Sequence, residues 1–313
     1  MSYAALMQVD QEALYGAVEA GGTKFVCALA DGSGKIHEQR RFPTTDPAAT
    51  LGAACEFLHA ASRRVGRLSA IGVASFGPIH LRHDSNLYGC IGKTPKPGWS
   101  GTDIVGVLTR EFSCPIGFDT DVNAAALAEH RWGAARDVDS MVYATIGTGI
   151  GGGVLHHGAP IHGLMHPEIG HIHPRRHPLD QSFSGICPFH GDCLEGLASG
   201  PAIVARSGCE FREIDPTHPQ WEIEADYLGQ LCAQLVVMVS PQRIVLGGGV
   251  MNQTQLLAPI RRRLLHWLGG YVDRAEILDR VEHYVVTPAL DAQSGVLGAL
   301  LLAIDANMRF SAK

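Results

Sequence analysis

The stretch YGAVEAGGTKFVCALA, residues 15–30, predicts how the fold begins. Two apolar runs flank a Gly-Gly turn, which is the pattern of a β-hairpin. Residues 141–157, MVYATIGTGIGGGVLHH, repeat the same layout of strand, glycine-threonine turn and strand. Two such hairpins, each followed by alternating helices and strands, predict two related α/β domains that face one cleft.

Between and after the hairpins, the chain alternates strand and helix patterns. Further strands are expected near 36–42, 70–75, 115–118 and 243–250. Helices are expected over 50–65, 102–112, 121–132, 199–206, 222–239, 253–268 and 294–306. This alternation implies largely parallel sheet cores with antiparallel hairpin edges. We expect a small domain over 1–120, a large domain over 121–293, and a C-terminal helix at about 294–313 that packs back on the small domain.

Composition narrows the class of protein. A chain of 313 residues, 46% hydrophobic, is long enough for two domains. The net charge is -6 and no Lys/Arg run stands out, so neither nucleic acid nor a membrane surface is an expected partner. No apolar run approaches about 20 residues and the N-terminus lacks a signal-peptide pattern, so we expect a cytoplasmic protein. The eight cysteines are scattered, which favours reduced thiols.

The segment FDTDVNAAALAE, residues 118–129, brings two acids to the start of a helix. Asp119 and Asp121 can act as helix caps, because carboxylates suit the positive end of a helix. Either one, beside a cleft, can also act as a general base that removes a proton from a substrate. The residues alone leave both roles open.

Histidine and cysteine concentrate later in the chain, since eight of the 16 histidines fall between 156 and 190. His190 follows Cys187 by three positions, and Cys193 follows His190 by three positions. Two thiolates with imidazoles suit a tetrahedral zinc ion, and an upstream histidine would supply the fourth ligand. A closed set of four ligands leaves no position for water, so the zinc is expected to be structural.

The glycine turns EAGGTK (19–24), TIGTGIGGG (145–153) and GGG (247–249) are candidates for anion binding. Successive backbone amides in such turns form a concavity for phosphate oxygens, and glycine allows a close approach. None of them fits the P-loop or the dinucleotide fingerprint. Ordinary hairpin turns are the alternative for any one of them, whereas their number favours phosphate or nucleotide contacts.

Taken together, EAGGTK, ASFGPI, DTDVNAAALAE, TIGTGIGGG, HPEIGH, CPFHGDCLEG and IVLGGGV occur in this order over about residues 15–305. The chain thereby resembles the ROK family of sugar kinases and repressors, and in detail its bacterial fructokinase branch. The resemblance implies the two-domain actin-like (ribonuclease-H-like) ATPase fold, with the active site in the cleft between α/β domains. It also implies a homodimer.

For the nucleotide, the resemblance implies ATP bound with Mg²⁺. Its phosphates would contact Gly21, Gly22, Thr23 and Lys24, and Thr145, Gly147, Thr148 and Gly149 on the other side. Gly247 and Gly248 would lie beside the adenosine. Glu19, where many family members have Asp, would hold Mg²⁺ through a water molecule.

For the sugar, the resemblance assigns the base to Asp121 and leaves Asp119 a structural role. Hydroxyl groups of the sugar would be contacted by Thr120, Glu168, His171 and Glu195. Family members often have Asn at the position of Thr120. Gly77 and Pro78 would shape the pocket. His171 would also complete the zinc set with Cys187, His190 and Cys193, and the zinc would orient its ring toward the sugar. The expected zinc loop spans about 168–195.

The resemblance in TDVN, ASFGPI and the CPFHGDC loop implies ATP-dependent phosphorylation of fructose to fructose 6-phosphate. A kinase for glucose, mannose or an N-acetylated aminosugar is the neighbouring alternative. A sugar-responsive repressor is disfavoured, because about 14 residues before the first strand are too few for a helix-turn-helix module. A sugar-binding protein without catalysis is the third alternative.

Overall fold

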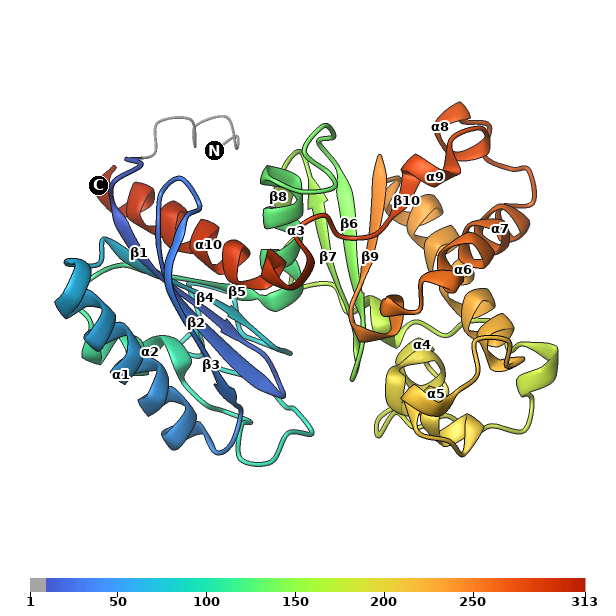
Figure 1. The fold of residues 1–313 in the computed structure, drawn as a ribbon, viewed down its shortest axis with the longest axis horizontal. Coiled ribbons are helices and arrows are strands. Elements are labelled where there is room, and N and C mark those ends of the chain that lie inside the picture. Colours follow the sequence, from blue (N-terminus) through green and yellow to red (C-terminus); the bar gives the residue numbers. More distant parts are fainter. Residues whose placement is uncertain (1–9, 313) are drawn as a thin grey trace. The chain divides into compact units, whose positions relative to one another are not determined.

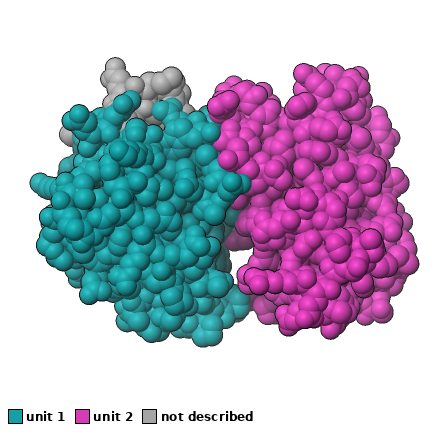
Figure 2. Space-filling view, in the orientation of Figure 1, with its two compact units in different colours: residues 1–132, 157–166, 290–313 teal, residues 133–156, 167–289 magenta. Residues whose placement is uncertain are grey.

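The computed structural model describes residues 10–312, which form two compact units. Unit 1 contains the residues up to 132, 157–166 and those from 290 onward (Figure 2, teal). Unit 2 contains residues 133–156 and 167–289 (Figure 2, magenta). Unit 1 is therefore assembled from three separate parts of the chain.

Unit 1 is built on a five-stranded sheet in the order β3-β2-β1-β4-β5 (Figure 1). Its strands are β1 (Leu14–Ala20), β2 (Lys24–Asp31), β3 (Ile36–Pro43), β4 (Ala70–Ser75) and β5 (Ile116–Thr120). β1 pairs antiparallel with β2 and parallel with β4, and β4 pairs parallel with β5. The mixed sheet follows from the sequence, since the tight Gly-Gly turn makes a hairpin and the longer connections allow parallel crossovers.

Helices α1 (Pro47–Val65) and α2 (Ile104–Glu111) cover one face of this sheet (Figure 1). Helix α10 (Ser294–Ser311) covers the other face and also packs against α3 (Asp121–Arg131). The approach of α10 is close enough to require glycine. A Cβ on Gly72 of β4 would lie 1.8 Å from the carbonyl oxygen of Ala299, and one on Gly298 would lie 2.0 Å from that of Ala124.

Unit 2 contains a second sheet, whose strands lie in the order β10-β9-β6-β7. They are β6 (Met141–Ile146), β7 (Ile150–His156), β9 (Arg243–Gly247) and β10 (Val285–Val286). β6 and β7 form an antiparallel hairpin, whereas β9 pairs parallel with β6. The short β8 (Ala159–Pro160) follows in the segment grouped with unit 1.

The helices of unit 2 are α4 (Leu194–Ala198), α5 (Gly200–Ser207), α6 (Gln220–Val239), α7 (Leu257–Leu268), α8 (Ala275–Leu278) and α9 (Val281–Tyr284). Single 3₁₀ turns are η2 (Ile169–His171), η3 (Pro178–Asp180), η4 (Phe211–Glu213), η5 (Gly249–Asn252) and η6 (Thr254–Leu256), with η7 (Asp291–Gln293) before α10. The long α6 is buried along most of its length and packs against α7 and α4.

Both predicted hairpins and the predicted α/β class are confirmed by these elements. The long helices also occur near the expected positions, although α7 begins at residue 257 because two 3₁₀ turns precede it. The short elements α4, α8, α9, β8 and β10 were not expected. The contacts group α3 with unit 1, whereas the division expected from the sequence begins the large domain at residue 121. The reason is the packing of α3 on α10.

Among the helices in residues 10–312, none combines the length and apolar character that crossing a membrane requires.

We predict that Gly72→Ala lowers the free energy of unfolding by about 1–3 kcal/mol or more, because the new methyl group would collide with backbone of α10. The control is Gly52→Ala. Gly52 lies in α1 with no heavy atom within 4 Å of its would-be Cβ, so the change should stabilise by up to about 1 kcal/mol. Urea unfolding measures both variants, and equal effects would contradict the close packing of α10.

Candidate active site

Three candidate segments of unit 1 leave its sheet at the same edge. Ala20 of β1 is in register with Ser75 of β4, and Ser75 is in register with Thr120 of β5. The turn 21–24 follows β1, the turn 76–79 follows β4, and Asp121 follows β5. The carboxyl ends of neighbouring parallel strands are where α/β proteins bind ligands. The register therefore brings the predicted phosphate turn, sugar-pocket turn and base to one edge.

The two acids of this segment, Asp119 in β5 and Asp121 directly after it, have different surroundings. Asp119 is buried, and its Oδ1 accepts hydrogen bonds from the Thr120 amide and the Asn123 side chain, both at 2.7 Å. The Nε2 atom of His162 lies 3.0 Å from the other oxygen, Oδ2. Both oxygens of the Asp119 carboxylate therefore have partners within the fold, as expected for a structural residue. These contacts also raise the pKa of His162, chiefly through the hydrogen bond to Asp119.

Asp121 is the first residue of α3 and is partly buried. Its Oδ1 accepts a hydrogen bond from the Val122 amide at 2.9 Å. The cap of α3 is Thr120 rather than either acid, since its hydroxyl oxygen accepts from the Asn123 amide at 3.0 Å. The positive end of the helix stabilises a carboxylate at this position. Such a group can accept a proton from a hydroxyl held nearby.

The first glycine turn is tight and partly exposed. The Gly21 amide donates to the Lys24 carbonyl at 3.1 Å, and the Thr44 hydroxyl donates to the Gly21 carbonyl at 2.7 Å. Glu19 precedes the turn on β1. Burial raises the pKa of its carboxyl group, while Lys24 and Arg41 oppose the shift. A cation near Glu19 would favour its charged form.

The second and third glycine turns meet at one edge of the sheet in unit 2. Thr145 of β6 is in register with Gly247 of β9. A Cβ on Gly248 would lie 2.3 Å from the carbonyl oxygen of Ile146, and the residue has a φ of 89°, so only glycine fits. The Gly147 carbonyl accepts from the Gly200 amide at 2.8 Å. Thr148 and Gly149 complete the turn between β6 and β7.

The predicted sugar-binding turn 168–171 packs on β7. The His171 amide donates to the Glu168 carbonyl at 3.0 Å, which closes the turn. A Cβ on Gly170 would lie 2.0 Å from the Ile150 carbonyl oxygen, and one on Gly152 would lie 2.1 Å from the Ile169 side chain. The glycine in the EIGH motif is therefore needed for this contact.

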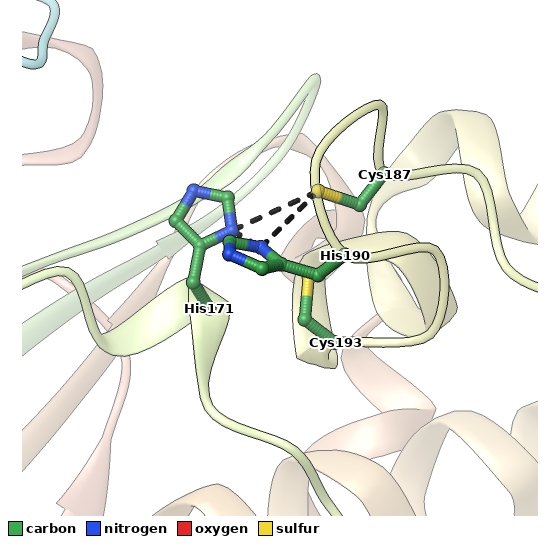
Figure 3. Close-up of side chains that lie close together, drawn as sticks. All are labelled: His171, Cys187, His190 and Cys193. Carbon is green, nitrogen blue, oxygen red and sulfur yellow. Dashed lines mark hydrogen bonds between the residues drawn. The ribbon is translucent and has the colours of Figure 1, made fainter.

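The predicted metal ligands His171, Cys187, His190 and Cys193 converge on one point (Figure 3). Their ligand atoms all lie within 4.8 Å of one another. His171 Nδ1 is 3.5 Å from Cys193 Sγ and 3.9 Å from Cys187 Sγ, and His190 Nδ1 is 3.6 Å from Cys187 Sγ. Two reciprocal backbone hydrogen bonds between Cys187 and Gly191 form the tight turn that carries His190. The cluster could hold a metal ion.

Two carboxylates lie beside this cluster in unit 2. Glu195 Oε2 accepts a hydrogen bond from the Ile150 amide at 2.9 Å, which links α4 to the glycine turn before β7. Burial, with a smaller contribution from Glu195, raises the pKa of Glu168 to about 7. Glu168 can therefore donate or accept a hydrogen bond near neutral pH.

Several site-forming residues were missed from the sequence. The Nε2 atom of His166 accepts from the Ile79 amide, and His162 contacts Asp119. The unusual density of histidine in this region was the only signal. Arg176 contacts Asp192 at 3.5 Å, and Arg206 pairs with the buried Asp180 at 2.9 Å, which fixes the loop before Cys187. No local pattern marks these arginines.

The His162–Asp119 pair predicts a pH-dependent contribution to stability. Because the pKa of His162 is raised on folding, the contribution is complete below its unfolded value, about 6.5, and is lost as pH rises through the folded value. With 40% of the His162 side chain exposed, it should stay below about 1 kcal/mol. Urea unfolding should show a larger gap between wild type and His162→Gln at about pH 6 than at about pH 9. A gap that grows with pH would contradict the pairing; His266→Gln, on an exposed face of α7, serves as control.

Comparison with known proteins gives a consistent result. The ROK family profile matches residues 15–306. The chain is 45% identical over 300 residues to the fructokinase of Zymomonas mobilis. The aligned region covers 95% of this chain and 98% of that protein. It is 42% identical over 290 residues to the fructokinase of Pediococcus pentosaceus, covering 93% and 97%.

Among solved structures, the ROK hexokinase from Thermus thermophilus matches with a TM-score of 0.75 at 27% identity, covering 96% of this chain and 100% of that one. This match confirms the predicted fold class. The match along the chain, together with the order of its motifs, shows that the protein belongs to the ROK family.

Proposed function

We propose that the protein is an ATP-dependent fructokinase that converts fructose to fructose 6-phosphate. The common sheet edge of unit 1 carries the argument, because it brings a candidate base, a phosphate turn and a sugar-pocket turn to aligned strand ends. The two fructokinases that share more than 40% of its residues along nearly the whole chain support fructose as the substrate. Other hexoses are the alternative within the same reaction.

In the proposed reaction, the sugar hydroxyl oxygen attacks the γ-phosphorus of ATP as the bond to ADP breaks. The hydroxyl proton passes to the Asp121 carboxylate. Asp121 suits this role because it stands at the start of α3, whereas Asp119 is held by Asn123 and His162. The Thr120 hydroxyl oxygen caps α3 by accepting from the Asn123 amide. The same hydroxyl group would donate a hydrogen bond to the sugar.

For the nucleotide, backbone amides of the turns 21–24 and 145–149 would bind phosphate oxygens, with the Lys24 ammonium group as a countercharge. Gly247 and Gly248 would allow the adenosine to approach the backbone. Bound Mg²⁺ would neutralise charge on the phosphates. Glu19 would hold it through water, and the cation would offset the burial that raises the pKa of this carboxyl group.

For the sugar, Glu168, His171 and Glu195 would bind hydroxyl groups. Turn 168–171, which packs on β7, carries the first two of these residues at its two ends. The Nδ1 atom of His171 faces the thiols, which leaves Nε2 for a hydroxyl group. Gly77 and Pro78 would form a wall of the pocket.

The metal in the Cys/His cluster is proposed to be zinc. A tetrahedral ion with ordinary Zn–N and Zn–S bonds separates a nitrogen and a sulfur ligand by about 3.6 Å. The three nitrogen–sulfur separations are 3.5, 3.6 and 3.9 Å, which are close to this value and support the proposal. The ion would be structural and would fix the ring of His171. A homodimer completes the proposal, supported by the family resemblance alone.

A purified-protein assay with ATP, Mg²⁺ and a panel of fructose, glucose, mannose and N-acetylated aminosugars tests the function. We expect the highest kcat/KM with fructose. A much higher value for glucose or mannose would reassign the substrate, and no transfer to any sugar would favour a binding protein.

For the base, we expect Asp121→Asn to lower kcat by about 10²–10⁴-fold with little change in the affinity for ATP. The matched control is Asp103→Asn, because Asp103 also starts a helix in unit 1 and Asn caps helices equally well. It should retain full activity. An unchanged kcat for Asp121→Asn would remove Asp121 as the base.

For the metal, elemental analysis should find about one zinc per chain in protein purified without chelator. Cys193→Ser should lose the zinc, lower the melting temperature and raise the KM for fructose, because the ion fixes both the loop and His171. Cys209→Ser, an exposed thiol outside the cluster, should keep the zinc. Metal-free wild-type protein with full stability and activity would exclude the site.

A further inference from the structure

The turn 76–79, which carries Gly77 and Pro78, is held by hydrogen bonds to three different parts of unit 1. The Phe76 amide donates to the Ala20 carbonyl at the end of β1, at 2.8 Å. The Pro78 carbonyl accepts from the Gly92 amide at 2.7 Å. The Ile79 amide donates to the Nε2 atom of His166 at 3.1 Å, the one side-chain anchor of the three. His166 lies 87 positions further along the chain.

His166 is buried, although the five residues before it are exposed. Its ring lies against the turn, since a Cβ on Gly77 would be 3.3 Å from Cε1 of the imidazole. Ile79 is buried as well, with 5% of its surface exposed. The contact is therefore an internal one in which the ring supplies both packing and an acceptor.

The acceptor role constrains the chemistry of the ring. Nε2 can accept from the Ile79 amide only when it carries no proton, so His166 is neutral with its proton on Nδ1. A phenyl ring would preserve the volume and remove the acceptor. The buried amide would then lack a partner, which is costly unless the turn moves.

We propose that His166 is a positioning residue for the sugar pocket: it fixes the turn that holds Gly77 and Pro78, and so sets how tightly the enzyme holds and discriminates its sugar. This inference rests on the proposed function. Two residues after His166 the chain reaches Glu168, a proposed hydroxyl ligand. His166 is thus the buried residue that follows an exposed segment, and it comes shortly before the EIGH motif in the sequence.

The test compares His166→Phe, which keeps the ring, with His166→Gln, which keeps an acceptor near the position of Nε2. His166→Phe should raise the KM for fructose by about tenfold or more, while the KM for ATP changes less than about twofold. His166→Gln should recover most of the loss. Hydrogen exchange of the Ile79 amide, followed without sugar or ATP, should be faster in His166→Phe and return toward wild type in His166→Gln. His266→Phe is the control.

Each outcome decides the proposal. Unchanged exchange and an unchanged KM for fructose in His166→Phe would overturn it. Equal losses in the Phe and Gln variants, or equal effects on fructose and ATP, would assign His166 to general packing and would also overturn it. If wild-type protein phosphorylates no sugar, the proposed function fails, and the exchange measurement still decides whether His166 holds the turn.

Discussion

The close approach of α10 to the first sheet constrains the rest of unit 1. Backbone atoms of α10 meet Gly72 of β4 and Gly117 of β5 at distances that leave no room for a Cβ, and Gly298 of α10 meets α3 in the same way. One helix thereby fixes two strands and the helix that begins with Asp121. Because β1, β4 and β5 end in register, this packing also sets where their three turns lie. The proposed chemistry needs such rigid support, since a base must be held near the proton that it accepts.

In unit 2 the candidate site residues are supported in a different way, by side-chain contacts in an irregular loop. Glycines again permit close backbone contacts, as at Gly170 and Gly248, but the loop after η2 is long and irregular. A cluster of four histidine and cysteine side chains that could hold a metal ion, together with two arginines, replaces regular structure there. The Glu195 carboxylate then ties the loop to the glycine turn through the Ile150 amide. One proposed sugar ligand of this unit, Glu195, is thus joined by a direct hydrogen bond to the residue that follows the proposed phosphate turn.

Local patterns in the sequence predicted most of the regular structure and three members of the histidine–cysteine cluster. The Gly-Gly and Gly-Thr-Gly turns mark hairpins by themselves, and the spacing of Cys187, His190 and Cys193 indicates a common ligand. The grouping of residues 157–166 with unit 1 was beyond such reasoning, because it depends on contacts with residues 79 and 119 that lie far away in the chain. The fourth member of the cluster, His171, was assigned by family resemblance, because the spacing alone did not distinguish it from the other upstream histidines. Short elements such as α4 and β10 carry too few residues for a periodic signal.

The three-part construction of unit 1 has a consequence for how the protein is made. Synthesis produces β1 to β5 well before α10, so the sheet face that α10 covers stays open until residues 294–311 have left the ribosome. All residues of unit 2 are synthesised before α10. A chain cut before residue 294 would keep the apolar face of β1, β4 and β5 exposed to chaperones and proteases. Resistance of this sheet to degradation therefore depends on the docking of α10.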